Sequence, residues 1–193
     1  MTIYFTSDLH LGDPRLKVFY RDLYFNSVDE MNQTIINNFN NILTEKDMLV
    51  IVGDACHDIK YIDLLDEIKC KEKILIIGNY DEDKLDELKP KFSVVHKQKY
   101  IQLEYKENDN FGVLISHKPT DIVREKDWGE ATEFLDLGIC GHIHSLWRVQ
   151  KYPIPIVNVS ADIWNFKPVS FSRIFNTYHA ILHYYDENVF PLK

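Results

Sequence analysis

The chain has 193 residues, of which 45% are hydrophobic and 27% are charged, and this size and balance predict one globular domain over residues 1–193. Thirty acidic against 22 basic residues give a formal charge of −8, which disfavours binding to long duplex nucleic acid because the protein would repel its phosphates. Three cysteines without paired metal spacing, and no apolar stretch long enough to span a bilayer, predict a cytoplasmic protein with reduced thiols.

Strand-like and helix-like stretches alternate in the first half of the chain. Three short apolar runs predict buried strands, at residues 3–6, 48–52 and 73–77. Apolar residues at helical spacing predict a helix over residues 27–43, where Ser27 and Glu30 fit a capping box, and a second amphipathic helix over residues 59–68. This alternation predicts an α/β fold with a partly parallel sheet.

Strand-like segments dominate the second half. Residues 99–107 and 111–116 flank an Asn/Asp-rich turn and predict a hairpin. Further strands are expected at residues 112–116, 137–140, 157–159 and 179–185. Together with the first half, this pattern predicts two sheets packed together between helices.

Polar residues with metal-binding side chains follow five of the predicted strands, at the point where each strand ends. They are Asp8 and His10, Asp54, Asn79, His117, and His142 and His144. In open α/β sheets, ligands bind where the carboxyl ends of strands meet the loops, so the five strand exits are expected to converge on one site. Glycines in these loops permit tight strand-to-loop turns, at positions Gly53, Gly78 and Gly141.

The converging groups are carboxylates, imidazoles and one amide oxygen. This mixture suits transition metals such as manganese, iron or zinc better than calcium, which favours an all-oxygen set. The Asp8/His10 and His142/His144 pairs are each two residues apart, so on an extended chain both members point to one face. If it stood alone, the Asp8/His10 pair or Asn79 would be more typical of an ordinary turn. Because ligand-type residues also follow four further strands, metal ligation is favoured.

These residues stand in five short motifs whose order resembles that of the calcineurin-like metallophosphoesterases. The motifs are Asp-x-His at 8–10, Gly-Asp at 53–54, Gly-Asn-x-Asp at 78–81, His117, and Gly-His-x-His at 141–144. One such motif is weak, but all five in order, each after an apolar run, form a specific signal. Residues 158–170 are also similar to the tail of small bacterial and phage members that lack a cap domain.

The resemblance implies a four-layer α/β-β/α sandwich, in which two mixed sheets are flanked by helices. It also implies two divalent transition-metal ions as cofactors, with manganese favoured and iron, zinc or nickel as alternatives. By position, Asp54 would bridge both ions. The remaining ligands would be Asp8, His10 and His144 for the first ion, and Asn79, His117 and His142 for the second.

The activity implied is hydrolysis of a small phosphomonoester or phosphodiester, such as a nucleotide or cyclic nucleotide, by a hydroxide that both ions share. The expected partner is thus a small phosphate-ester substrate, and neither long duplex nucleic acid nor a membrane. Two alternatives stay open. One is a nuclease acting on short nucleic acid, and the other is a non-catalytic metal-binding scaffold, which the full set of seven ligands disfavours.

Tyr80 and Asp81 are the candidate catalytic residues, at a point where the chain departs from the family pattern. The family usually has a histidine after Asn79 as its leaving-group acid, and this sequence has Tyr80 followed by Asp81. Tyrosine has a reference pKa of about 10 against about 6.5 for histidine, so Tyr80 is expected to be a weaker acid. The alternatives are that Tyr80 only packs against the loop and that water or His57 donates the proton.

Several other polar and aromatic residues allow a functional interpretation beside a structural one. Lys118 and Arg148 could bind a phosphate oxygen, but exposed cations without that role are more common. Trp164 and Phe166 could stack on a nucleobase, but core packing is expected for aromatics in an apolar tail. The remaining histidines have no supporting pattern and are interpreted as structural: His96, His179 and His183.

Overall fold

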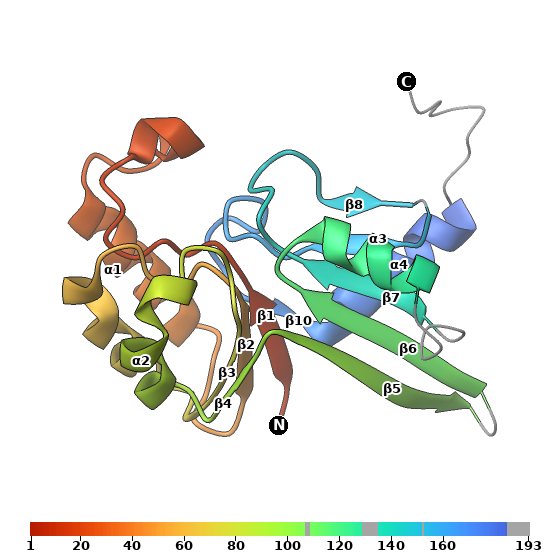
Figure 1. The fold of residues 1–193 in the computed structure, drawn as a ribbon. Helices are drawn as coiled ribbons and strands as arrows, with labels where there is room; N and C mark the ends of the chain where they lie inside the picture. The colour runs from red at the N-terminus through yellow and green to blue at the C-terminus, as the bar shows by residue number, and fades with distance from the viewer. Residues whose placement is uncertain (107–108, 129–134, 152, 185–193) are drawn as a thin grey trace.

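The computed structural model describes residues 1–106, 109–128, 135–151 and 153–184. Within these residues, ten strands form two five-stranded sheets that face each other (Figure 1). The first sheet has the order β10-β1-β2-β3-β4, with β1 to β4 parallel and β10 antiparallel to β1. Its strands are β1 (Ile3–Thr6), β2 (Met48–Val52), β3 (Glu72–Ile76), β4 (Val94–His96) and β10 (Val169–Ser170).

The second sheet has the order β5-β6-β7-β9-β8 and is mixed. Its two edge pairs, β5/β6 and β8/β9, are antiparallel, whereas β6/β7 and β7/β9 are parallel. The strands are β5 (Gln98–Lys106), β6 (Asp109–Ser116), β7 (Leu135–Cys140), β8 (Val149–Gln150) and β9 (Ile156–Asn158). Since β4 ends at His96 and β5 begins at Gln98, the chain passes from one sheet to the other within a single connecting residue.

Helices cover the outer faces of both sheets (Figure 1). On the first sheet these are α1 (Val28–Asn40), the 3-10 helix η3 (Ile59–Glu67) and α2 (Leu85–Leu88). On the second sheet α3 (Pro119–Trp128) packs on β6 and β7. The helix α4 (Phe171–Tyr184) follows β10 and contacts β1 and β9. Four short 3-10 helices lie in the connections: η1 (Leu16–Phe19), η2 (Arg21–Leu23), η4 (Glu82–Lys84) and η5 (Lys89–Lys91).

Three apolar clusters separate the four layers. Along β2, Leu49 and Ile51 pack outward against α1, whereas Val50 and Val52 pack inward against the second sheet. A strand buried on both faces has no polar face, which is why β2 is a continuous apolar run. Outside the second sheet, a third cluster includes Ile122 of α3. The predicted four-layer sandwich of two mixed sheets is therefore confirmed.

The helix α1 begins as its sequence predicts, with one difference in the cap. Ser27 is the N-cap, and its Oγ accepts from the backbone N–H of Glu30 at 3.1 Å. The Glu30 carboxylate accepts from the backbone N–H of Asn26, at 2.8 Å, rather than from that of Ser27. The capping box is thus formed in one direction only, while Met31, Ile35 and other apolar residues of α1 are buried against the sheet.

One predicted element is wrong in type. Residues 179–184 belong to α4 and not to a strand, because Phe171, Ile174, Phe175 and Tyr178 continue a helical repeat into them. The amphipathic helix predicted at 59–68 is confirmed as the 3-10 helix η3, Ile59–Glu67. The predicted hairpin is confirmed by the antiparallel β5/β6 pair, while residues 107–108 of its turn lie outside the described residues.

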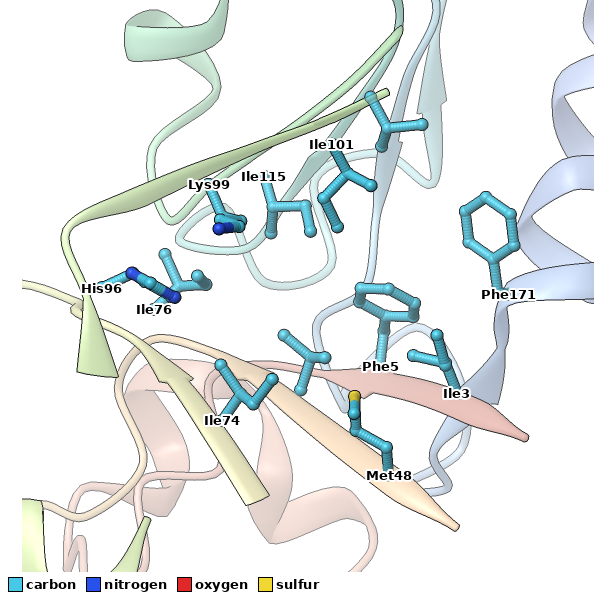
Figure 2. A pocket seen from close by; sticks show the side chains of 12 residues that line it. Ile3, Phe5, Met48, Ile74, Ile76, His96, Lys99, Ile101, Ile115 and Phe171 are labelled. Carbon is cyan, nitrogen blue, oxygen red and sulfur yellow. The ribbon is translucent and has the colours of Figure 1, made fainter. Parts of the chain in front are cut away.

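A cavity of about 150 Å³ lies between the two sheets (Figure 2). Its lining runs from Ile3 and Met48, the first residues of β1 and β2, to Ile76 and His96, the last residues of β3 and β4. His96 and Lys99 are the polar side chains among its mostly apolar lining. Among the described helices, none is both long and apolar enough to cross a membrane.

Candidate metal centre

The seven predicted ligands lie in the loops that leave β1, β2, β3, β6 and β7 at their carboxyl ends. Because β1 to β3 belong to the first sheet and β6 and β7 to the second, the site joins the two sheets. Backbone hydrogen bonds hold the loops together, including Asp8 N–H to Gly53 O at 3.0 Å and His10 N–H to Asp54 O at 3.0 Å. The loop of the second sheet is fixed similarly, since Gly141 N–H donates to His117 O at 3.0 Å.

Five of the seven residues have left-handed backbone conformations, which L-residues adopt at a cost. The residues with positive φ are Asp8 (55°), His10 (48°), Asp54 (55°), His142 (73°) and His144 (48°). Such strained positions cost about 1–3 kcal/mol each and persist where the surroundings impose them, typically at functional sites. The pairs two residues apart therefore reach the site through left-handed turns, and not through the extended chain that the sequence suggested.

The side chains form two groups, each compact enough to hold one ion. Within each group the ligand atoms all lie within 4.8 Å of one another. The first group comprises Asp8, His10 and His144, and the second comprises Asp54, His117 and His142. The Oδ1 atom of Asn79 joins the second group, 3.1 Å from His117 Nε2.

Asp54 lies between the two groups. Its Oδ2 atom is 3.5 Å from His10 Nε2 and 3.3 Å from His117 Nε2. Its Oδ1 atom accepts a hydrogen bond from the backbone N–H of Tyr80 at 2.9 Å. One carboxylate oxygen is thus held by the protein, and the other faces ligands of both groups.

The electrostatics of the site fit bound cations. His10 is fully buried, and neither of its ring nitrogens has a hydrogen-bond partner, an arrangement that costs free energy unless a metal ion accepts a lone pair. Burial lowers the pKa of His10 to about 4, so the ring is neutral, as a metal ligand must be. Burial also opposes the charging of His117, but its hydrogen bond to Asp54 and the charges of Asp8 and Asp54 raise its pKa to about 9. The carboxylates of Asp8 and Asp54 therefore make the space beside His117 favourable for a positive charge.

Further hydrogen bonds orient the ligand atoms. The Oδ2 atom of Asp8 accepts from Ser7 Oγ and Ser160 Oγ, each at 2.6 Å, and from the His142 N–H at 3.0 Å. Its Oδ1 atom lies 3.8 Å from His144 Nε2, within the first group. The Nδ1 atom of His117 lies 2.8 Å from Val52 O, so the tautomer that donates to this carbonyl presents the Nε2 lone pair to the second group.

The side chain of Asp81, a candidate catalytic residue from the sequence, binds backbone N–H groups of two loops. Its side chain is fully buried, and burial raises its pKa to about 6. Its oxygens accept from three backbone N–H groups, those of Asp54 at 2.8 Å, Ala55 at 2.9 Å and Gly78 at 2.8 Å. Asp81 therefore joins the loops after β2 and β3 and has no contact with the site opening.

Tyr80 lies at the edge of the first group, beside residues that the sequence did not single out. Its ring packs edge-on against that of His10, with 4.9 Å between centroids. Its hydroxyl accepts from Arg15 Nη1 at 3.1 Å, and Arg15 is held by a bidentate ion pair with Asp13. His57 Nδ1 lies 3.4 Å from the same Asp13 carboxylate, so His57 also stands beside Tyr80.

The other residues considered from the sequence have structural contacts. Arg148 donates to Ile163 O at 2.8 Å and stacks on the Trp164 ring, whose Nε1 donates to Asn158 O. Phe166 is buried in the core beside α1, so the expectation of core packing is confirmed for it. Lys118 directly follows His117 and is exposed.

The residues near the ligands that were missed from the sequence include Asp13, Arg15, Arg21 and Asp162. The two arginines stand in the irregular segment after His10, which has no periodic signal. Asp162 could have been found, because it follows β9, a sixth strand whose carboxyl end points to the same edge as β7. Its Oδ2 atom lies 2.9 Å from His144 Nδ1.

The sequence and the fold were compared with those of known proteins. Residues 1–164 match the calcineurin-like phosphoesterase superfamily domain. An uncharacterized protein of Methanocaldococcus jannaschii, MJ1445, is 29% identical over 180 residues, which cover 89% of this chain and 88% of that protein. The protein of unknown function AQ665 from Aquifex aeolicus has a solved structure with a TM-score of 0.71 and 25% identity, covering 91% of this chain and 98% of that one. A novel archaeal phosphodiesterase aligns with a TM-score of 0.45 and 18% identity over 82% of each chain.

Proposed function

The chain belongs to the calcineurin-like phosphoesterase superfamily, and from this premise we propose that it is a dinuclear-metal phosphoesterase acting on a small phosphomonoester or phosphodiester. The observation that carries the proposal is the position of Asp54 Oδ2, 3.5 Å from His10 Nε2 and 3.3 Å from His117 Nε2. A single carboxylate oxygen between two groups of imidazole ligands is the arrangement that two ions sharing one ligand require.

In the proposed centre, Asp8, His10 and His144 would hold the first ion, and Asn79, His117 and His142 would hold the second. Asp54 would be a ligand available to both ions. Nitrogen and oxygen ligands of this kind suit manganese, with iron, zinc or nickel as alternatives. When bound, divalent ions at these residues would supply a nucleophile by lowering the pKa of a bound water, and they would neutralise charge on the phosphoryl oxygens.

The chain's own residues supply the remaining functions. Asn79 and His142 are exposed while Asp8 and His10 are fully buried, so a substrate approaches from the side of the second group. With its Oδ1 atom turned to that group, the Asn79 amide N–H₂ is free to donate to a phosphoryl oxygen, a contact that stabilises developing charge.

Tyr80 is the proposed donor to the leaving group. Because Arg15 donates to the Tyr80 oxygen, the phenol proton is not used in that contact and is available to a departing alkoxide. The Arg15 guanidinium also lies over the Tyr80 ring, 5.1 Å from its centre, and so holds the ring in place beside the first ligand group. His57 stands close enough to serve as the alternative donor, since its ring centre is 5.7 Å from that of Tyr80.

The substrate is proposed to be small, such as a nucleotide or cyclic nucleotide. The formal charge of −8 argues against a continuous nucleic-acid backbone, whose binding depends on many cationic contacts. Local attraction for one phosphate comes from the two ions, which outweigh the nearby carboxylates.

A substrate screen tests the proposal. Protein freed of metal and then supplied with manganese would be assayed on nitrophenyl mono- and diesters, cyclic nucleotides, dinucleotides and a plasmid. We expect manganese-dependent hydrolysis of a small ester and no cleavage of the plasmid. Cleavage of the plasmid would support a nuclease instead, and two bound ions without any hydrolysis would support a non-catalytic scaffold. Asp47→Asn, a buried aspartate far from the ligands, is the control variant and should retain activity.

A further inference from the structure

Arg21 is a fully buried cation beside the first ligand group. It is 1% exposed, and such a charge is tolerated only when its donors are all paired. Its Nε and Nη2 atoms donate to the two oxygens of Asp162, at 2.8 Å and 2.9 Å, in a bidentate fork. Its Nη1 atom donates to Leu9 O at 2.8 Å, and Nη2 also donates to Asp8 O.

These contacts fix the loop that carries two ligands. The carbonyls of Asp8 and Leu9 belong to the turn in which Asp8 and His10 both have left-handed conformations. Two hydrogen bonds from one rigid guanidinium hold successive carbonyls of that turn, which stabilises a conformation that L-residues otherwise avoid. Arg21 thereby connects the Asp8–His10 turn to Asp162.

Asp162 in turn fixes His144. Its side chain is 6% exposed, and its Oδ2 atom accepts from Arg21 and lies 2.9 Å from His144 Nδ1. A carboxylate in this position selects the tautomer with a proton on Nδ1, which leaves the Nε2 lone pair directed toward Asp8. The Phe19 ring stacks on His144, with 4.2 Å between ring centres, so the imidazole plane is restricted as well.

We propose that Arg21 and Asp162 form a buried pair of positioning residues that sets the tautomer and orientation of His144 and holds the Asp8–His10 turn for the first ion. The inference rests on the proposed function in one respect, that His144 binds a metal. A purely structural ion pair would affect unfolding but would leave the two ion affinities of the folded protein unchanged.

Manganese binding by the purified full chain tests this, with Asp162→Asn as the main variant. Its Oδ1 atom can still accept from Arg21 Nε, but an N–H₂ group at the Oδ2 position loses the bond from Arg21 Nη2 and faces His144 Nδ1. A donor there favours the His144 tautomer protonated on Nε2, whose Nε2 cannot bind metal. We expect the affinity of one ion to fall by about 10 to 100-fold while the other is little changed. Arg21→Lys keeps the charge but loses the bidentate contact with Asp162. It should lower the affinity for the same ion by less than Asp162→Asn does.

The matched control is Asp47→Asn, because Asp47 is also buried and accepts from Thr2 and Thr44 but lies away from the ligands. It should lower the melting temperature and leave both affinities unchanged. Unchanged binding of both ions by folded Asp162→Asn would overturn the inference. Wild-type protein that binds two ions without hydrolysing any ester would overturn the proposed activity alone, and protein that binds none would overturn both.

A second measurement does not depend on the folding of a variant. In metal-free wild-type protein at mildly alkaline pH, nitrogen–proton NMR correlations of His144 report which ring nitrogen carries the proton. The geometry predicts Nδ1, and a proton on Nε2 alone would contradict the role of Asp162.

Discussion

Replacing Gly53 by alanine tests whether the site depends on close packing of backbone against its ligands. Gly53 has φ +86°, and a Cβ there would lie 2.2 Å from His117 Nδ1 and 2.8 Å from Gly78 Cα. The His117 ring must therefore move by on the order of 1 Å to restore van der Waals contact. Because Nδ1 bonds Val52 O at 2.8 Å, this movement breaks that hydrogen bond and turns Nε2 away from the second group.

Two costs set the size of the effect. A left-handed conformation costs an L-residue about 1–2 kcal/mol, and leaving a buried polar group without its partner costs about 1–3 kcal/mol. The sum is about 2–5 kcal/mol, and for a chain of this length each kcal/mol lowers the melting temperature by about 2–4 °C. Loss of an orienting hydrogen bond on a metal ligand further reduces metal affinity by about 10 to 100-fold.

Gly12→Ala is the matched control for backbone strain. Gly12 has nearly the same φ, +83°, but its Cβ would meet the ring of Tyr61, which is no metal ligand. Both variants should melt at lower temperature, and only Gly53→Ala should lose affinity for one manganese ion in calorimetric titration. If Gly53→Ala bound two ions as tightly as the wild type, the proposed role of His117 would be refuted.

Further substitutions at four positions separate the roles of individual side chains. Asp81→Ala leaves three buried N–H groups unpaired at about 1–3 kcal/mol each, so urea denaturation should show a loss of at least about 3 kcal/mol; an unchanged midpoint would contradict its structural role. Asp54→Ala should lose both ions and Asp8→Ala only one, as counted by elemental analysis, and two tightly held ions in the Asp54 variant would exclude bridging. Tyr80→Phe should barely change nitrophenyl ester hydrolysis but slow alkyl esters, whereas Tyr80→His should accelerate the latter; equal effects on both ester classes would exclude the acid role.

The sequence predicts the architecture well where one physical signal dominates. Strands such as β2 are buried on both faces and stand out as continuous apolar runs, and the ligands follow directly where these strands end. The positions of Asp8 and Asp54 at one edge of the first sheet then follow from its parallel strands, whereas His117 reaches the same site from β6 of the second sheet. The last helix was mistaken for a strand because residues 179–185 alone are too short to show the helical repeat that begins at Phe171.

What the sequence could not give is the direction of individual side chains within loops. Asp81 stands in a catalytic motif, yet its carboxylate turns inward to backbone N–H groups that only the folded loops bring together. Arg21 and Asp162 are 141 residues apart, and no periodic pattern connects them. Their pairing arises from tertiary structure, as do the left-handed turns that place His142 and His144 in different groups.

The central claim is that two ions, joined through Asp54, are needed for hydrolysis. The most direct measurement adds manganese in steps to metal-free protein and records both the bound ions per chain and the rate on a nitrophenyl diester. The account predicts no turnover without metal and a rate that reaches its plateau at two bound ions per chain. Full activity in metal-free protein, or a plateau at one ion, would contradict it.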